Sequence, residues 1–418
     1  MFARRWILLL AAAWAAYGQG SPHQLDVDSF EKVWTTVRDK HWQTKPGGLD
    51  WQAIHNEFRP RMDQAATRDE ARGVMQEMLG RLGQSHFAII PAAIYSVVDD
   101  ENGGPGVTGI DLRILQGQAI VTNVDTGSPA ETQGVRPGWQ VVRAGGKELK
   151  PVIDQALSNS AIHELQMTRA VLARLSGAMG GTVQADFLDG SGKTVRLMLS
   201  LTAPRGPISA FGNLPAQHVW FESQKTGAVT YVRFNLFLDL PRVMAGFQQA
   251  VENCKPCDGL IIDLRGNPGG IGGMAMGMAG FLVDKPNQRL GTMYLRDTTL
   301  NFVVNPRADV LSAPVAVLVD ALSASTSEIF AGGLKDLGRA RVFGTRTAAA
   351  ALPSAFERLP NGDGFQYALA NYISQGGQPL EGLGVTPDVE VRLTRSGLLA
   401  GSDAVMDAAL NWIRRQKP

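Results

Sequence analysis

Residues 314–344 read PVAVLVDALSASTSEIFAGGLKDLGRARVFG, and this stretch carries the strongest structural signal in the chain. Its first six residues form a continuous apolar run, typical of a strand in a parallel sheet that is buried on both faces. The following Ser-Thr-Ser-Glu predicts the start of a helix, since apolar residues then recur at helical spacing at Ile329, Phe330, Leu334 and Leu337. Ser325 stands between the two. A serine there is usually a helix cap, but the same position directs a hydroxyl and free helical N–H groups at one point.

The region around this stretch alternates strands and helices. Residues 227–237 and 259–266 are further apolar strand patterns, and residues 402–415 form a closing helical pattern. This alternation predicts an α/β layer with a largely parallel sheet over residues 204–418.

The preceding residues, 21–100, are mostly helical in pattern. Phe30, Val33, Trp34 and Val37 recur on one helix face, and Asp50 is placed to cap a second helix. We therefore expect a small N-terminal helical domain.

Residues 101–203 change character to short strands separated by turns. The block DTGSPAETQGVRPGWQVV, residues 125–142, resembles a PDZ domain, although Trp139 stands where that family usually has aspartate. The resemblance implies an inserted domain that binds a peptide's C-terminus as an added strand. The peptide's terminal carboxylate would bind to the loop of Val107, Thr108, Gly109 and Ile110. The alternative is that this loop serves only as a hinge.

Composition excludes some classes of function. The 418-residue chain has a net charge of +1 and 19% charged residues. Such a composition lacks the excess positive charge that attracts nucleic acid, so nucleic-acid binding is not expected. Residues 1–20 have the layout of a secretory signal peptide, and no later segment is apolar for long enough to cross a membrane. We expect an exported protein, periplasmic or extracellular, that does not span a membrane.

The two cysteines, Cys254 and Cys257, lie in a polar loop before a strand. A local disulfide is the plain interpretation in an oxidising compartment. A thioredoxin-type site would open a helix instead, and a zinc site would need two more ligands nearby. We predict neither a metal nor an organic cofactor.

Two motifs together resemble the carboxy-terminal processing and tricorn-like serine proteases: GLIIDLRGNPGG at residues 259–270 and SASTSEIFAGGLKD at residues 323–336. The resemblance covers nearly all of the chain after residue 20. It implies a crotonase-like α/β protease core that follows an inserted PDZ domain. Within the second motif it makes Ser325 the nucleophile, with Ser323 and Ser327 as supports.

A serine nucleophile needs a base, and the processing branch of this family takes a lysine 25 residues downstream. Position 350 is alanine here, so that dyad is absent. Lys335 lies about 15 Å further along the same helix, and Arg346 stays protonated.

The tricorn-like branch uses histidine instead. Its Leu-x-x-Ser-His motif matches residues 82–86, which makes His86 the proposed general base with Ser85 beside it. The branch's glutamate motif matches residues 380–388 and implies Glu381 as the fourth member, although an ordinary loop carboxylate is the alternative.

The tetrahedral intermediate of such a reaction needs two N–H donors. Thr326, directly after the nucleophile, would supply one. By motif position Gly270 would supply the other, with Gly269 as the neighbouring possibility.

These residues predict an exported serine peptidase that cleaves proteins or peptides through an acyl-enzyme on Ser325. The alternative is a catalytically inactive protein that binds peptides through its PDZ domain and core cleft, as the missing lysine suggests. Acyl-CoA chemistry is a third reading of a crotonase-like core, and the signal peptide argues against it.

Overall fold

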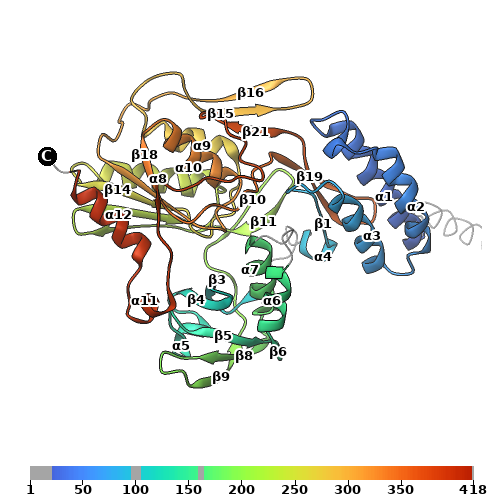
Figure 1. Ribbon diagram of the computed structural model, residues 1–418, viewed down its shortest axis with the longest axis horizontal. Coiled ribbons are helices and arrows are strands. Elements are labelled where there is room, and N and C mark those ends of the chain that lie inside the picture. Colours follow the sequence, from blue (N-terminus) through green and yellow to red (C-terminus); the bar gives the residue numbers. More distant parts are fainter. Residues whose placement is uncertain (1–20, 96–104, 159–163, 417–418) are drawn as a thin grey trace, which may run out of the picture. The chain divides into compact units, whose positions relative to one another are not determined.

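The computed structural model describes residues 21–95, 105–158 and 164–416 (Figure 1). The predicted signal peptide lies outside these residues. The chain forms two compact units, one of residues 1–93 with 354–369 and one of residues 94–353 with 370–418.

Within the described residues, the first unit contains three α-helices, a short 3₁₀ helix and a small antiparallel sheet. Its elements are α1 (Pro22–Lys40), η1 (Pro46–Gly48), α2 (Trp51–Gln64), α3 (Arg68–Gly80), β1 (Ala88–Ile90), β19 (Ser354–Arg358) and β20 (Gly364–Ala368), and α4 (Ala92–Tyr95) links it to the second unit. The strands pair in the order β1-β20-β19. The predicted cap is confirmed, because the Asp50 carboxylate accepts from the Ala53 N–H at 3.0 Å.

The second unit begins with a β-rich domain between residues 105 and 202. Its elements are β2 (Gly106–Val107), β3 (Ile110–Leu115), β4 (Gln118–Val124), α5 (Pro129–Thr132), β5 (Gln140–Ala144), β6 (Lys147–Glu148), α6 (Lys150–Ser158), α7 (Glu164–Ala173), β7 (Ser176–Gly177), β8 (Thr182–Leu188) and β9 (Thr194–Ser200). The main sheet has the order β3-β4-β5-β8-β9, with β6 paired to β5. β3 is therefore an edge strand, and its apolar residues pack into this domain's own core.

The rest of the second unit is an α/β layer. Its elements are β10 (Ile208–Phe211), β11 (Leu214–His218), β12 (Phe221–Thr226), β13 (Val229–Phe234), η3 (Leu240–Met244), α8 (Ala245–Asn253), β14 (Gly259–Asp263), α9 (Gly272–Ala279), β15 (Gln288–Tyr294), β16 (Thr299–Val304), β17 (Val315–Val319), α10 (Thr326–Asp336), β18 (Ala340–Gly344), β21 (Asn371–Ser374), β22 (Val389–Glu390), α11 (Arg395–Leu399) and α12 (Ala404–Arg414).

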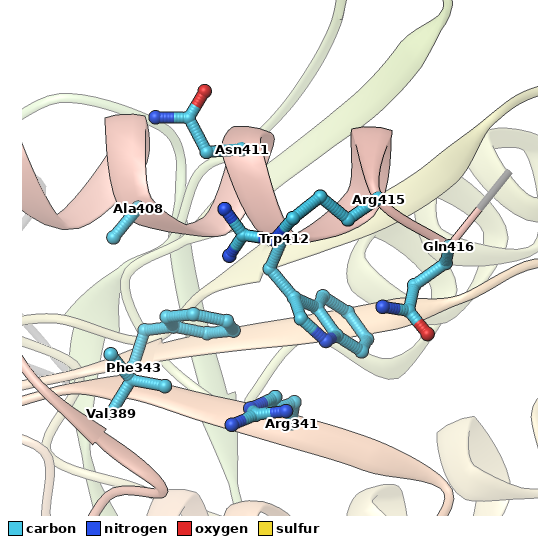
Figure 2. A pocket seen from close by; sticks show the side chains of 8 residues that line it. All are labelled: Arg341, Phe343, Val389, Ala408, Asn411, Trp412, Arg415 and Gln416. Carbon is cyan, nitrogen blue, oxygen red and sulfur yellow. The ribbon is translucent and has the colours of Figure 1, made fainter.

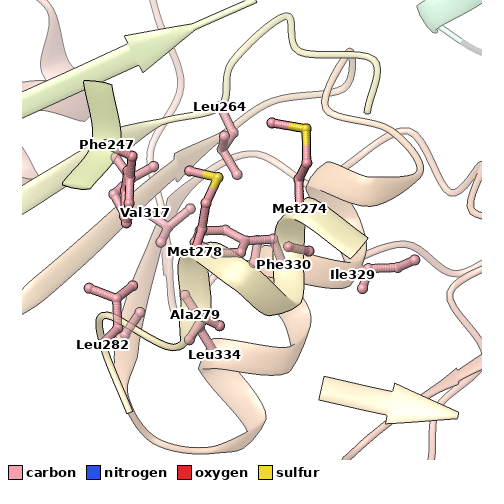
Figure 3. Close-up of a cluster of buried hydrophobic side chains, with 14 of the residues drawn as sticks. Phe247, Leu264, Met274, Met278, Ala279, Leu282, Val317, Ile329, Phe330 and Leu334 are labelled. Atoms are coloured by element: carbon pink, nitrogen blue, oxygen red, sulfur yellow. The ribbon is translucent and has the colours of Figure 1, made fainter. Parts of the chain in front are cut away.

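The central sheet has the order β12-β13-β14-β17-β18-β22, and every pair from β13 to β22 is parallel. The predicted parallel sheet is thus confirmed, and β14 and β17 are buried along their whole length because helices cover both faces. Met274 and Met278 of α9 pack with Phe330 of α10 against one face (Figure 3). α12 covers the other face.

Two further features bear on the expectations from sequence. Cys254 and Cys257 form the predicted disulfide. Among the helices that the structure describes, none has the length and apolar character that crossing a membrane requires.

Candidate active site

Ser325 ends a sharp turn between β17 and α10. We call this turn, residues 320–325, the serine turn. The Ser325 backbone has φ 54° and ψ −119°, a region that residues other than glycine rarely occupy and that clusters at functional sites. Every residue from Leu322 to Leu334 is buried except Ser325, which is partly exposed. The strained turn therefore presents one hydroxyl to solvent from an otherwise closed segment.

The neighbouring serines hold this turn to the glycine-rich loop that follows β14. The Ser323 hydroxyl donates to the Leu264 carbonyl at 2.8 Å, and the Ser327 hydroxyl donates to the Asn267 carbonyl at 2.9 Å. Both side chains are fully buried. Their contacts are those of structural supports, in keeping with the role expected for them.

The glycine-rich loop passes very close to the serine turn. A side chain at position 269 would place its Cβ 2.7 Å from the Thr326 nitrogen and 2.8 Å from the Ser325 Cβ. Contacts under 3.0 Å do not occur for real Cβ atoms. Only glycine permits this approach.

Two N–H groups at this junction donate no hydrogen bond to another described residue. The Gly270 carbonyl accepts from the Thr326 hydroxyl at 2.7 Å, and the flanking peptide groups bond to Phe237. Within the described residues, the N–H groups of Gly270 and Thr326 have no acceptor. These are the two donors expected from sequence, and Gly270 is exposed.

Position 350 lies directly beside Ser325. The Ser325 N–H donates to the Ala350 carbonyl at 2.8 Å and also to the Glu328 carboxylate at 3.0 Å. The alanine there offers no basic group, although the backbone places residue 350 where it touches Ser325.

Glu328 was not singled out from the sequence, yet it organises this region. Its carboxylate is completely buried and accepts from the Thr347 hydroxyl at 2.6 Å and from two consecutive N–H groups, of Ala349 at 3.0 Å and Ala350 at 3.1 Å. Burial raises the pKa of Glu328 to about 7, although these hydrogen bonds favour its ionised form. One side chain thus fixes both the serine turn and the segment beside it.

Glu328→Gln is expected to remove a pH dependence of stability. Because the folded pKa is raised, the native state holds a proton between pH 4.5 and about 7 that the unfolded state has released. Wild-type stability should therefore decrease as pH rises through this window, by about 3 kcal/mol relative to Glu328→Gln. Chemical denaturation of both proteins at pH 5 and pH 8 measures the difference. If the difference in stability between the two proteins were the same at pH 5 and pH 8, this role of Glu328 would be contradicted.

Glu381 approaches the same segment from another loop. Its carboxylate accepts from the Ala351 N–H at 3.0 Å, and the next N–H, of Gly382, donates to the Ala349 carbonyl at 2.9 Å. The residues around Ser325 and Glu381 are therefore joined through the backbone of residues 349–351.

Ser85 and His86 belong to the first unit, whereas Ser325, Thr326, Gly270 and Glu381 belong to the second. The Ser85 hydroxyl and His86 Nδ1 are 2.6 Å apart, so this nitrogen is engaged by the residue that the sequence motif places beside it. His86 also has a positive φ of 61°.

A second histidine supports this turn and was missed in the sequence. His41 is fully buried, and its Nδ1 accepts from the Gln43 N–H at 3.0 Å. Its Nε2 therefore carries the hydrogen and donates to the Gln84 side chain at 2.9 Å. Gln84 directly precedes Ser85, so His41 helps to fix the backbone that presents His86.

The loop at residues 107–110 is closely tied to its own domain. The Thr108 carbonyl accepts from Ala130, and the Gly109 carbonyl accepts from Asp125. Gly109 has φ 80°, and a Cβ there would lie 2.2 Å from the Ser128 Cβ. The loop leads into β3, the edge strand of the sheet.

Arg113 of β3 connects the β-rich domain to the serine turn. It donates to Asp320 at 2.6 Å and to Asp111 at 2.6 Å. The Asp320 carboxylate also accepts from the N–H groups of Gly266 and Leu322. Burial by itself would raise the pKa of Asp320, but Arg113 and these N–H groups hold it below its usual value.

Arg113→Ala is expected to destabilise the protein by about 3 kcal/mol, because it leaves the Asp320 carboxylate, whose side chain is only 15% exposed, without its cation. Arg143→Ala is the matched control, because Arg143 lies in the same domain with a side chain that is 41% exposed. A denaturation midpoint for Arg113→Ala equal to that of Arg143→Ala would show that the contact contributes little.

Two protein-family models match parts of the chain. The model of Peptidase family S41 matches residues 225–391, and that of the tricorn protease C1 domain matches residues 27–80. The first contains the serine turn and the glycine-rich loop, and the second lies within the helical unit.

Curated relatives agree with these matches. The carboxyl-terminal-processing peptidase 3 of Arabidopsis thaliana chloroplasts is 26% identical over 86% of this chain and 67% of its own length. The carboxyl-terminal-processing protease of a Picosynechococcus species is 26% identical over 86% of this chain and 82% of its own. Tricorn protease homolog 1 of Streptomyces coelicolor is 24% identical over 91% of this chain and 34% of its own.

Solved structures show the same fold. The photosystem II D1 C-terminal processing protease aligns with a TM-score of 0.60 at 23% identity, covering 92% of this chain and 99% of that one. Mature CPAF aligns with a TM-score of 0.64 at 13% identity, covering 96% of this chain and 99% of that one.

Proposed function

Because the chain is a serine-type peptidase of the carboxyl-terminal-processing and tricorn-like kind, we propose that it is an exported processing enzyme that acts through an acyl-enzyme on Ser325. Its substrates are proteins or peptides, as for any peptidase. The observation that carries the proposal is the partly exposed serine on a strained turn, beside two N–H groups that lack acceptors among the described residues.

In this mechanism the Ser325 hydroxyl attacks the peptide carbonyl while His86 accepts its proton. The oxyanion of the tetrahedral intermediate then receives hydrogen bonds from the N–H groups of Gly270 and Thr326. α10 begins at Thr326, so its N-terminal dipole also favours negative charge at this point. Collapse releases the amine with the proton from His86, and water hydrolyses the acyl-enzyme by the same steps.

Histidine is the proposed base because residue 350 touches Ser325 yet is alanine. Ser85 would orient the imidazole through Nδ1, and Glu381 would complete the tetrad from the loop that contacts residues 349–351. The core would be of the crotonase-like type.

The β-rich domain is proposed to act as a PDZ domain. β3 is an edge strand that can accept an added peptide strand, and it follows the candidate carboxylate loop at residues 107–110. Export is proposed from the sequence of residues 1–20, and a disulfide suits an oxidising compartment.

The alternative is a protein that binds peptides without cleaving them. Incubation of the purified protein with an unfolded polypeptide, followed by mass spectrometry, separates the two. New peptide termini that appear with time support a peptidase. Stable binding of intact polypeptide, with no new termini at any enzyme concentration, would favour the binding protein.

A further inference from the structure

The turn that joins β19 to β20 is buried against the helices of the first unit. Its Asn361 donates from the side-chain amide to Asp26 of α1 at 2.8 Å and from the backbone N–H to the Ser29 hydroxyl at 3.0 Å. The Arg68 side chain of α3 donates to the Asn361 carbonyl at 2.6 Å, although 293 residues separate the two in the chain. The tip of the hairpin is therefore fixed to both α1 and α3.

Asp363, in the same turn, has a carboxylate with no solvent exposure. Its Oδ2 accepts from Arg72 Nε at 2.9 Å and its Oδ1 accepts from a second Arg72 nitrogen at 2.8 Å, which is the paired geometry that arginine and carboxylate prefer. Oδ1 also accepts from the Ala92 N–H at 2.8 Å, and Oδ2 accepts from the Asn361 amide at 3.2 Å. Both oxygens are thus engaged within the helical unit, as in an anchor.

These contacts hold both flanks of the segment that presents His86. The segment comprises residues 81–87, from the end of α3 to the start of β1. Arg72 lies on α3, and Ala92 lies two residues beyond β1. The Asp363 carboxylate therefore connects the helix before His86 to the chain that leaves the strand after it.

The backbone at His86 needs such support, because a φ of 61° is strained for histidine and persists only where the surroundings fix it. β1 pairs with β20 so that Ile90 lies opposite Gly364, the residue after Asp363. The hairpin thus holds the strand that follows His86. A base must be held closely, since a displacement of about 1 Å can lower a rate by about 10²-fold.

We propose that Asp363 is a positioning residue for His86 in peptide hydrolysis. This inference rests on the proposed function, in which His86 is the base that accepts the Ser325 proton. Asp363 takes no part in the proton transfer itself. It fixes α3 and the chain after β1, so that the imidazole is presented in one orientation.

The test is a double-mutant cycle, measured as the rate at which a serine-reactive phosphonate labels Ser325 in the full chain. Asp363→Asn keeps the shape of the side chain but cannot accept from all of its partners. It should slow labelling by about 10- to 10²-fold in the otherwise unchanged chain. In the His86→Ala background it should have no effect, because there is no longer a base to position.

Two control variants separate this role from general effects on the helical unit, and thermal unfolding is measured for each. Asp28→Asn makes the same charge change at an exposed site on α1 and should be labelled at the wild-type rate. Val33→Ala opens space in the core of the same unit and takes no part in the hydrogen bonds of Asp363. It should lower the unfolding temperature with little effect on labelling.

A second variant tests the same contact from α3. Arg72→Lys keeps the positive charge but cannot form the paired hydrogen bonds to Asp363, so labelling should slow by about fivefold, again only when His86 is present. Arg341→Lys is its matched control, because Arg341 is an exposed arginine of the second unit beside Trp412 (Figure 2). This pair decides the question also if Asp363→Asn fails to fold.

The outcomes are distinct. Wild-type labelling rates in both Asp363→Asn and Arg72→Lys would overturn the inference and leave His86 as the base. The same slowing with and without His86 would also overturn it, because Asp363 would then act on the fold alone. If His86→Ala were labelled as fast as the wild type, the proposed base itself would be wrong, and the role of Asp363 would be lost with it.

Discussion

Ser325→Ala is expected to lower kcat/KM for peptide hydrolysis by about 10⁴-fold or more, because it removes the atom that forms the acyl-enzyme. The fold should persist, since the residue is partly exposed and the turn is held by Ser323, Ser327 and Glu328. Steady-state hydrolysis of a fluorogenic peptide, together with thermal unfolding, measures both properties.

Ser396→Ala serves as the matched control, because Ser396 is an exposed serine of the same unit, on α11. It should retain wild-type hydrolysis. If the alanine at position 325 left hydrolysis intact, another residue would have to be the nucleophile.

His86→Ala is expected to reduce hydrolysis by a similar factor, since a serine hydroxyl without a base is a poor nucleophile at neutral pH. Wild-type kcat/KM should fall on acidification as an imidazole base becomes protonated. Added imidazole should restore part of the activity of the variant.

His23→Ala is the control for this variant, because His23 is exposed in the same helical unit. Full activity of His86→Ala would remove His86 from the mechanism while leaving Ser325 as nucleophile. Loss of activity in both variants alike would point to a general effect on the helical unit.

Local sequence patterns predicted the parts of the site that are contiguous in the chain. The apolar strand, the turn at Ser325 and the helix at Thr326 follow from hydrophobic periodicity and capping residues within about 20 positions. The parallel sheet follows from repetition of this pattern, and the disulfide follows from two cysteines three residues apart.

Long-range contacts could not be predicted in this way. Glu328 looked like an ordinary acidic residue in the first turn of a helix, and its role depends on the segment at residues 347–350. His41 and Gln84 are 43 residues apart, and Arg113 and Asp320 are 207 residues apart. The hairpin of β19 and β20, at residues 354–369, packs with the helical unit although it follows the core strands in sequence. Hydrophobic periodicity contains no information about such pairings.

The central claim is that Ser325 is a nucleophile activated by His86, and the rate of covalent labelling by a serine-reactive phosphonate tests it most directly. Intact-protein and peptide mass spectrometry should show one adduct per chain, on Ser325. The adduct should form about 10³-fold more slowly in His86→Ala than in the wild type or His23→Ala. An adduct on a different residue, or equal labelling rates in wild type and His86→Ala, would contradict the claim.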